Sequence, residues 1–277
     1  CYIIFFLSYN ATAAQENTTL QNALADIRSS VEKLINIKDD DSLESSSKDF
    51  KKLETSKDIL QKITNFGLLE VSVFKKELGN LSIEKLLTSD YTFDAAEAHD
   101  TLNNTLTYYA AYFTSTSERI KNLKKYEEAQ NLARDLKIWR EEIFNPGIER
   151  IIALKLILHN KNIIKIANSR FEKILLDLKK LKNAKLITFN TLQTSINGAA
   201  ASINSAEALD TEATALIIKI LKTSAVTQNK NNGDNQNTPT DFQKINNIVE
   251  QSFLKIKDAY KRFIETNELV KKMMGIN

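Results

Sequence analysis

The sequence predicts an all-α protein, an elongated bundle of several long helices that includes a long C-terminal helix. Only six Gly and two Pro occur in 277 residues, and repeated β-hairpins need such residues in their tight turns. Nonpolar residues recur at intervals of three and four along most of the chain, which is the period of an amphipathic helix. A hydrophobic fraction of 42% with 26% charged residues suffices for a packed core.

The first residues predict an exported protein. Residues 2–9, YIIFFLSY, form an apolar run that is followed by ATAA at residues 11–14. An apolar run before an A-x-A pattern is typical of the later part of a secretory signal, and this run is too short to span a bilayer. We interpret residues 1–14 as a signal-peptide remnant that is removed by cleavage after Ala13 or Ala14. The alternative is a lipidated Cys1, although a polar tether normally follows such a cysteine.

The first helix is predicted over about residues 18–37. Its inward stripe consists of Leu20, Leu24, Ile27, Val31 and Leu34. Residues 38–47, with three consecutive Asp and a run of Ser, lack an apolar period and are predicted as a loop. The inward stripe of the second helix consists of Phe50, Leu53, Leu60, Ile63 and Phe66. Gly67 and Gly79 are expected to break the chain on either side of a shorter third helix.

The middle of the chain contains three further helix starts. Asp94 and Glu97 have the spacing of a capping box. The inward stripe of the helix that they begin consists of Ala98, Leu102, Leu106, Tyr109 and Phe113. Ser117 is expected to open the next helix, whose stripe consists of Leu132, Leu136, Trp139 and Ile143. Pro146 then begins a new helix, because the N–H that proline lacks would have no helical partner at that position.

From Ile148 the helical pattern continues to about Ile196, and Gly198 is expected to end it. The seam of this segment consists of Ala167, Phe171, Ile174, Leu178 and Leu181. At about 1.5 Å per residue the segment forms a rod of roughly 70 Å, unless residues 159–162 bend it. A further helix over residues 205–226 is expected to bury Leu209, Leu216, Ile217 and Ile220.

The end of the chain combines a low-complexity segment with the most regular helix. After a helical bundle of residues 15–226, residues 227–240 are mostly Asn, Gln, Lys and Thr and are predicted to be a flexible polar linker. The C-terminal segment, residues 241–277, has a stripe that consists of Phe242, Ile245, Val249, Ser252, Ile256, Ala259, Phe263, Thr266, Val270 and Met273. Its Ser, Ala and Thr members predict a close crossing in which this helix packs on the bundle.

Residues that could carry catalysis or hold a cofactor are scarce. The two histidines, His99 and His159, are far apart, and the sequence contains no HExxH, CxxC, glycine-rich phosphate loop or G-x-S-x-G motif. Cys1 is the single cysteine, so the chain after the signal has no disulfide, thiolate metal site or cysteine nucleophile. We predict a non-enzymatic protein with no catalytic residue, no cofactor and no metal.

Two adjacent tyrosine positions are candidates for a protein interface. Tyr108 and Tyr112 lie four residues apart, on a stripe beside the inward-facing Tyr109 and Phe113. Half-exposed tyrosines are common hot spots in protein interfaces. The other interpretation is that these side chains are ordinary parts of the core.

Charge is distributed unevenly along the chain. The net charge is only +3, which does not indicate nucleic-acid binding, but residues 119–185 contain 17 Lys and Arg against 8 Asp and Glu, a net charge of +9. This predicts either solvated helix faces or a patch for a polyanion, namely a glycosaminoglycan or an anionic lipid. The residues assigned to the patch are Lys161, Lys165, Arg170, Lys173, Lys179, Lys180, Lys182 and Lys185.

An exported, disulfide-free helical chain rich in Lys, Asn and Ile resembles the helical surface and outer-membrane-associated proteins of Borrelia-type spirochaetes. The helix over residues 242–273 is similar in position and character to the long last helix of their CspA-like complement-regulator-binding lipoproteins. That resemblance implies a surface protein that contacts a host factor, either a complement regulator or the extracellular matrix. The cleavage pattern at residues 11–14 is more similar to the helical outer-membrane-spanning porin of these organisms. This second resemblance implies a helical protein that binds the outer membrane peripherally.

Overall fold

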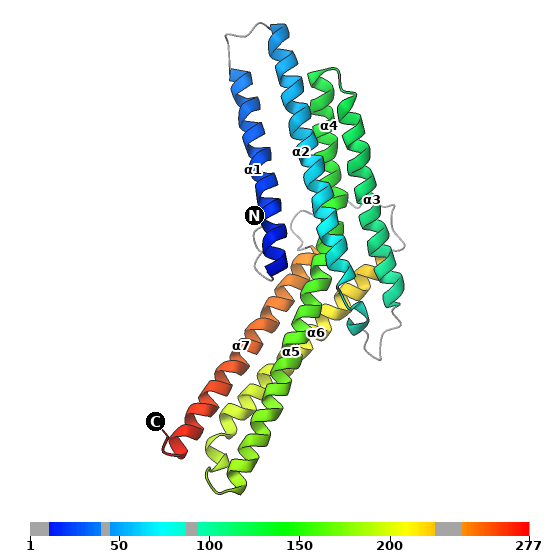
Figure 1. Cartoon of the computed structure of the whole chain (residues 1–277). Coiled ribbons are helices and arrows are strands. Elements are labelled where there is room, and N and C mark those ends of the chain that lie inside the picture. The colour runs from blue at the N-terminus through cyan, green and yellow to red at the C-terminus, as the bar shows by residue number, and fades with distance from the viewer. Residues whose placement is uncertain (1–10, 40–44, 87–93, 225–239, 277) are drawn as a thin grey trace. The chain divides into compact units, whose positions relative to one another are not determined.

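A computed structural model describes residues 11–39, 45–86, 94–224 and 240–276. Within these ranges the chain consists of helices and the turns between them, without a strand, which confirms the predicted all-α class with long helices (Figure 1). The expected signal remnant, apart from residues 11–14, and the expected linker, apart from residue 240, lie outside the described residues.

The chain divides into two compact units. Unit 1 comprises residues 1–80 and 99–148, and unit 2 comprises residues 81–98 and 149–277. The described elements of unit 1 are α1 (Ala11–Asp39), α2 (Ser45–Gly79), most of α3 (Ala95–Lys121), α4 (Tyr126–Trp139), the π-helical turn η3 (Arg140–Phe144) and the first residues of α5. Those of unit 2 are η2 (Ile83–Leu86), the start of α3, most of α5 (Asn145–Asn183), η4 (Phe189–Thr191), α6 (Gln193–Ser224) and α7 (Asp241–Met273).

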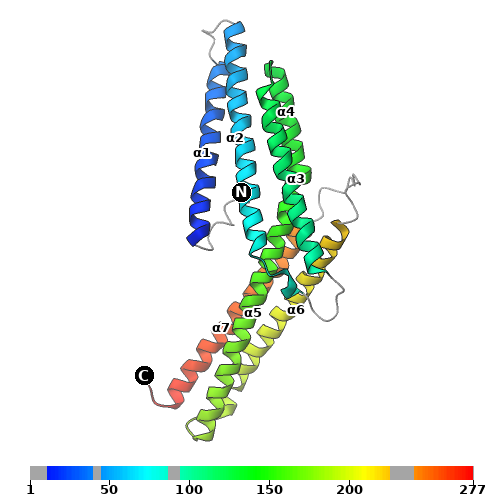
Figure 2. The ribbon, with the colours of Figure 1, turned by 45° about the vertical axis from the view of Figure 1, so that its right-hand side comes forward.

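In unit 1, helices α1 to α4 lie side by side (Figures 1 and 2). Of the α1 side chains that the structure describes, only Ser30 is buried. Its hydroxyl donates to Asp58 of α2 at 2.9 Å and accepts from Lys62 at 2.7 Å. Lys62 Nζ also lies 2.9 Å from Asp58 Oδ2. The hydrogen bonds that Asp58 accepts from Lys62 and, to a smaller extent, from Ser30 lower the pKa of its carboxyl. A polar contact therefore helps to hold α1 on α2.

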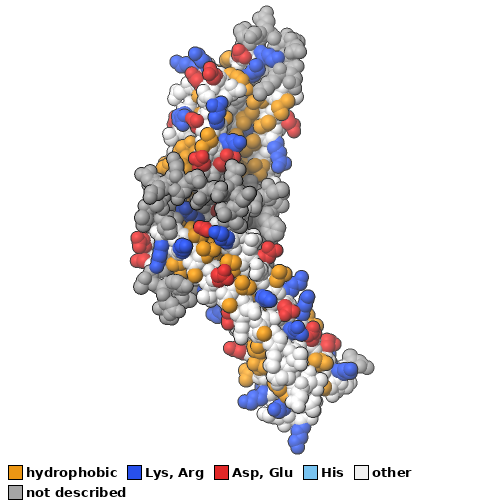
Figure 3. All heavy atoms as spheres, turned by 180° about the vertical axis from the view of Figure 1, so that it is seen from behind, with side chains coloured by type: hydrophobic (Ala, Val, Ile, Leu, Met, Phe, Trp, Pro, Cys, Tyr) orange, Lys and Arg blue, Asp and Glu red, His pale blue; other side chains and the backbone are white. Residues whose placement is uncertain are grey.

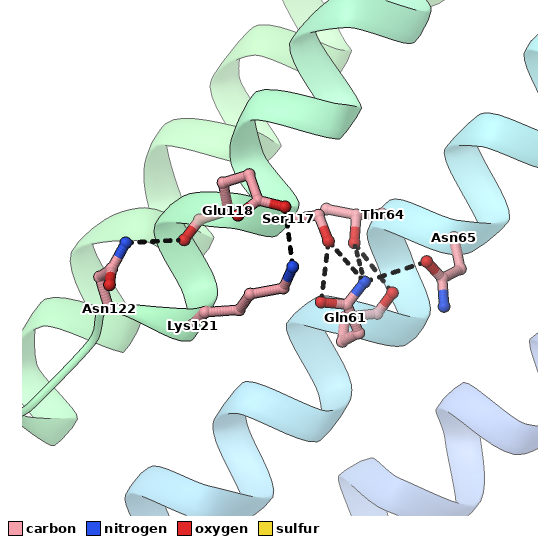
Figure 4. Close-up of polar contacts among 7 residues, drawn as sticks. All are labelled: Gln61, Thr64, Asn65, Ser117, Glu118, Lys121 and Asn122. Atoms are coloured by element: carbon pink, nitrogen blue, oxygen red, sulfur yellow. Dashed lines mark hydrogen bonds and ion pairs between the residues drawn. The ribbon is translucent and has the colours of Figure 1, made fainter.

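A second polar contact joins α2 to α3 (Figure 4). Gln61 Nε2 donates to Ser117 Oγ at 2.8 Å and to Asn65 Oδ1 at 3.0 Å. The expectation that Ser117 opens a helix is wrong, because α3 continues to Lys121. Ser117 lies inside α3, where its hydroxyl bonds to a neighbouring helix.

The start of α3 shows the Asp94 half of the predicted capping box. Asp94 Oδ1 accepts hydrogen bonds from the backbone N–H groups of Ala96 at 2.9 Å and Glu97 at 3.1 Å, which satisfies donors that the first turn of a helix leaves free. The five residues predicted for its inward stripe, namely Ala98, Leu102, Leu106, Tyr109 and Phe113, are all buried.

Gly67 does not break α2, contrary to the prediction, whereas Gly79 does end it. A Cβ atom at position 67 would overlap the ring of Phe113 on α3. The glycine therefore serves a close approach between two helices, a role that sequence alone does not distinguish from a helix break.

Pro146 does not begin a new helix either, because α4, η3 and α5 follow one another without a gap. The backbone N–H of Asn145 donates to the carbonyl of Arg140, five residues earlier. This π-helical turn inserts an extra residue just before Pro146, where an α-helix would place the proline ring against the preceding turn.

Three residues that were predicted to face inward are exposed. They are Val31 (40% exposed), Phe50 (65%) and Ile143 (43%). For Ile143 the reason is the π-helical turn: an extra residue rotates the stripe, so that Phe144 takes the buried position.

In unit 2, helices α5, α6 and α7 form a three-helix bundle (Figures 1 and 2). The core cluster nearest the middle of the bundle consists of Ile164, Ala167, Ile203, Ala206, Ile256 and Ala259. The small residues in the α7 stripe face α6. There, Ser252 Oγ donates to the backbone carbonyl of Ala206 at 3.2 Å. The two backbones are therefore close at this crossing.

The boundary between α5 and α6 differs from the prediction. Helix α5 ends at Asn183, where Lys185 takes the left-handed conformation with φ 58° and the Leu186 N–H bonds to the Leu181 carbonyl. This pattern is a Schellman end, which usually contains Gly or Asn. A lysine in that position gives no sequence signal, which is why the predicted helix ran on to residue 196.

Gly198, the expected end of that helix, lies inside α6. A Cβ atom there would lie 3.1 Å from Nε of Arg262 on α7. The glycine there leaves room for the Arg262 side chain, a less tight contact than the one at position 67.

Candidate functional site

Six aromatic side chains of unit 1 form a continuous cluster, called here the aromatic cluster. Its members are Tyr108, Tyr109, Tyr112 and Phe113 of α3, Trp139 at the end of α4, and Phe144 at the end of η3. The helical spacing of the four α3 residues places them along one side of that helix, and the π-helical turn brings Phe144 beside Trp139.

Trp139 lies at the centre of the aromatic cluster. The ring of Tyr112 stacks on it at 3.7 Å between centroids and 10° between planes. Tyr109 and Phe113 meet it edge-on, at 5.5 Å and 5.2 Å. Edge-on and parallel contacts of this kind stabilise aromatic pairs by about 0.5–1.5 kcal/mol beyond the burial of their area. The indole is therefore held from several sides.

The two predicted interface tyrosines differ in exposure. Tyr108 is 54% exposed, and its ring centroid lies 6.5 Å from that of Trp139. Tyr112 is partly buried, and burial is the main cause that raises the pKa of its hydroxyl above 10.0. The structure thus gives Tyr112 a packing role as well as a partly exposed surface, while most of the Tyr108 side chain is open to solvent.

Arg140, which follows Trp139 in the chain, forms an ion pair that the sequence did not reveal. Its Nη2 lies 2.7 Å from Oε2 of Glu70 on α2, and both side chains are largely buried. Burial raises the pKa of the Glu70 carboxyl, and the charge and hydrogen bond of Arg140 partly oppose this. The guanidinium also lies 4.7 Å from the ring centroid of Phe144, a favourable cation–π distance.

Two buried donors, one in the aromatic cluster and one on the adjacent Arg140, lack hydrogen-bond partners among the described residues. They are Nε1 of Trp139 and Nη1 of Arg140. An unpaired buried donor costs about 1–3 kcal/mol and is uncommon in native cores. It coincides here with a π-helical turn, a feature that occurs frequently at functional sites. These two features distinguish the aromatic cluster from ordinary packing.

The residues assigned to the polyanion patch lie along α5 and just beyond its end. At about 100° per residue they are distributed around the helix, rather than along one face. Lys161 pairs with Asp210 at 3.2 Å, and Lys180 with Asp177 at 3.1 Å. Arg170 lies over the ring of Tyr260 at 5.2 Å. The structure therefore does not bring the eight side chains together as one patch.

A polar groove of about 560 Å³ lies between α5 and α6. Lys161, Lys165, Glu172, Glu207 and Asp210 line it with polar and apolar neighbours. Because basic and acidic groups alternate there, the groove presents no surface of one charge.

Asp210, at the wall of the groove, is buried and accepts a hydrogen bond from Asn160 Nδ2 at 2.8 Å. Burial raises the pKa of this carboxyl, and the contacts with Asn160 and Lys161 partly oppose this. The sequence analysis did not predict the contact between Asp210 and Asn160, although the sequence contains a signal for it. Asp210 interrupts an apolar stripe of α6 that consists of Ile203, Ala206, Ala213 and Ile217, and a polar residue on such a stripe indicates a buried polar contact.

Neither a metal-binding group nor a membrane-spanning helix occurs among the described residues. No group of three or more His, Cys, Asp or Glu side chains among them is placed to hold a metal ion. None of the described helices has an apolar stretch long enough to cross a membrane. The chain matches no protein-family model, and the comparisons with curated proteins and with solved structures found no match.

Proposed function

We propose that this chain is a non-enzymatic helical binding protein that acts by protein–protein contact through Tyr108 and Tyr112. The supporting observation is that Tyr108 is 54% exposed while its ring lies against the buried rings of Tyr109 and Trp139. A tyrosine that packing already holds loses little conformational freedom when a partner covers it. Tyrosines are also enriched among the residues that dominate binding energy.

The proposed setting is the cell exterior, and the proposed partner is a host protein, either a complement regulator or a component of the extracellular matrix. The support is the apolar run and the A-x-A pattern within residues 2–14, together with the resemblance to spirochaetal surface proteins. No residue of this chain is assigned to one particular host protein.

The proposal can be tested by surface plasmon resonance with the purified full chain and purified complement regulators and matrix proteins. We expect one of these proteins to bind, and Tyr108→Ala to weaken that binding by about 30-fold, the effect of a residue worth about 2 kcal/mol. Tyr108→Phe keeps the ring and should retain most of the affinity.

The matched control is Phe50→Ala, which removes an exposed ring (65%) from α2 of the same unit. It should leave the affinity unchanged. Absence of binding to every protein tested, or equal affinity for the Tyr108→Ala variant and the unaltered chain, would contradict the proposal.

A further inference from the structure

One end of unit 2 combines several lysines with exposed nonpolar side chains. This basic end consists of residues 176–193, which contain the end of α5, η4 and the start of α6, and residues 268–276, at the end of α7. The two segments meet in a core cluster in which Leu178 and Ile187 pack near Val270 and Met273. Figures 1 and 2 show the ends of α5 and α7 side by side there.

Helices α5 and α7 end in the same way at the basic end. Lys185 and Gly275 both have left-handed backbones, with φ of 58° and 69°. The next residues, Leu186 and Ile276, donate their N–H groups to the carbonyls of Leu181 and Lys271, both at 3.0 Å. The residue at this position of a Schellman end is commonly nonpolar and packs back on its own helix.

That packing leaves much of the two side chains in solvent. Leu186 is 49% exposed and Ile276 is 51% exposed, and Met274 beside them is also exposed. The Schellman ends account for nonpolar residues at these positions, but they do not account for half of each side chain remaining in water. The basic end thus presents nonpolar surface that its own bundle does not cover.

The net charge around these nonpolar residues is positive. The basic end contains six lysines and two acidic residues, a net charge of +4. Both acids are already paired, Asp177 with Lys180 and Glu268 with Lys271. Four lysines, namely Lys179, Lys182, Lys185 and Lys272, form no ion pair among the described residues. Of these, Lys182 Nζ lies over the ring of Phe189, 5.4 Å from its centroid. Figure 3 shows Lys and Arg side chains around this end of unit 2 on the face that it draws.

We propose that the basic end of unit 2 docks on an anionic lipid surface. Each lysine near such a surface strengthens binding by about fivefold, and nonpolar side chains next to it can enter the boundary between headgroups and acyl chains. A sulfated polysaccharide would attract the lysines, but it offers no apolar layer for Leu186, Met274 and Ile276. The nonpolar residues therefore favour a bilayer over a polysaccharide. The proposal concerns unit 2 and is independent of the proposed role of Tyr108.

The test is cosedimentation of the full chain with vesicles of phosphatidylcholine alone and of phosphatidylcholine mixed with phosphatidylglycerol, at low and high salt. We expect binding to the anionic vesicles only, and weaker binding at high salt. Two variants probe the site. The charge variant carries Lys182→Gln, Lys185→Asn and Lys272→Gln, with Asn chosen because it tolerates the left-handed conformation, and the apolar variant carries Leu186→Gln and Ile276→Gln.

Each variant has a matched control in unit 2, away from the basic end. Lys165→Gln, Lys255→Gln and Lys257→Gln remove the same charge from exposed positions, and Ile166→Gln with Leu254→Gln removes exposed nonpolar groups. We expect the charge variant to bind about 100-fold more weakly, the apolar variant to lose most of its binding, and both controls to lose much less. Circular dichroism should show equal helix content in all variants.

Three results would overturn the proposal. The first is no binding of the unaltered chain to anionic vesicles at low salt. The second is equal loss of binding in the variants and their controls, which would indicate diffuse charge attraction. The third is retention on heparin that depends on the three lysines, without vesicle binding, which would indicate a polysaccharide ligand.

Discussion

The ring of Tyr112 lies parallel to the indole of Trp139, with 3.7 Å between their centroids. Trp139 is the single tryptophan of the chain, so tryptophan fluorescence reports on the surroundings of this one side chain. The stack also distinguishes the two candidate interface residues. Tyr112 covers the indole, whereas the ring centroid of Tyr108 lies 6.5 Å from that of Trp139 and its side chain remains mostly exposed.

Tyr112→Ala should therefore expose Trp139 to water. We expect a red shift of the tryptophan emission and a loss of at least about 1 kcal/mol in the free energy of unfolding, from the lost aromatic contact and the lost burial. Fluorescence spectra and urea unfolding curves measure the two effects. Tyr108→Ala is the control and should change both quantities far less. Equal emission spectra for the two variants would show that the stack does not shield the indole.

Gly67→Ala tests the close approach of α2 and α3. The added Cβ would overlap the ring of Phe113, which is fully buried and cannot move away easily, so we expect the free energy of unfolding to fall by about 1–3 kcal/mol. Gly79→Ala is the matched control, because nothing lies within 4 Å of the added atom. It should be neutral or slightly stabilising, since alanine restricts the unfolded chain. Equal thermal midpoints for the two variants would refute the steric explanation.

The helices themselves could be predicted from the sequence. The three- and four-residue spacing of nonpolar residues within one helix largely decides which of its side chains are buried. The α3 and α7 stripes show this, since Leu106 and Ile245 are fully buried where the three- and four-residue steps place them. The ends of helices were harder to predict. Lys185 ends α5 in a conformation that the sequence rules assign to Gly or Asn, and Gly67 and Gly198 lie inside helices because a partner helix approaches them.

The candidate site was less predictable than the fold, because it depends on contacts between distant residues. Glu70 and Arg140, whose guanidinium contacts Phe144 of the aromatic cluster, are 70 positions apart in their ion pair. No local pattern relates them. The spacing of nonpolar residues also gives no sign of the π-helical turn that places Phe144 in the cluster. That spacing assigned the buried position to Ile143. Tyr108 and Tyr112 could be proposed from their spacing, but their different exposure could not.

Ala259→Leu tests the crossing of α6 and α7. Ala259 is fully buried in the core cluster that both helices share with α5, and a larger side chain would force the two backbones apart. We expect a loss of about 1–3 kcal/mol in the free energy of unfolding. Leu254→Ala, at an exposed position of the same helix, should change it by less than about 0.5 kcal/mol. Chemical unfolding followed by circular dichroism compares the two. A neutral Ala259→Leu variant would mean that the crossing has spare volume.

Asp210→Asn tests the buried carboxyl of unit 2. Burial raises the pKa of Asp210 above 3.8 in the folded state, against the opposing contacts with Asn160 and Lys161. Between the pKa of the unfolded chain and this raised value, the folded state binds more protons than the unfolded state. The contribution of Asp210 to stability must therefore fall as the pH rises through that window.

The asparagine variant cannot titrate at this position and shares the other titrating groups of the chain, so it serves as the reference. We expect the stability of the unaltered chain relative to the variant to be greatest at the acid side of the window and to decline as the pH rises. Urea unfolding of both proteins at a series of pH values measures this difference. A difference that grows with pH would mean that the Lys161 ion pair outweighs burial, and that the carboxyl is held ionised rather than protonated.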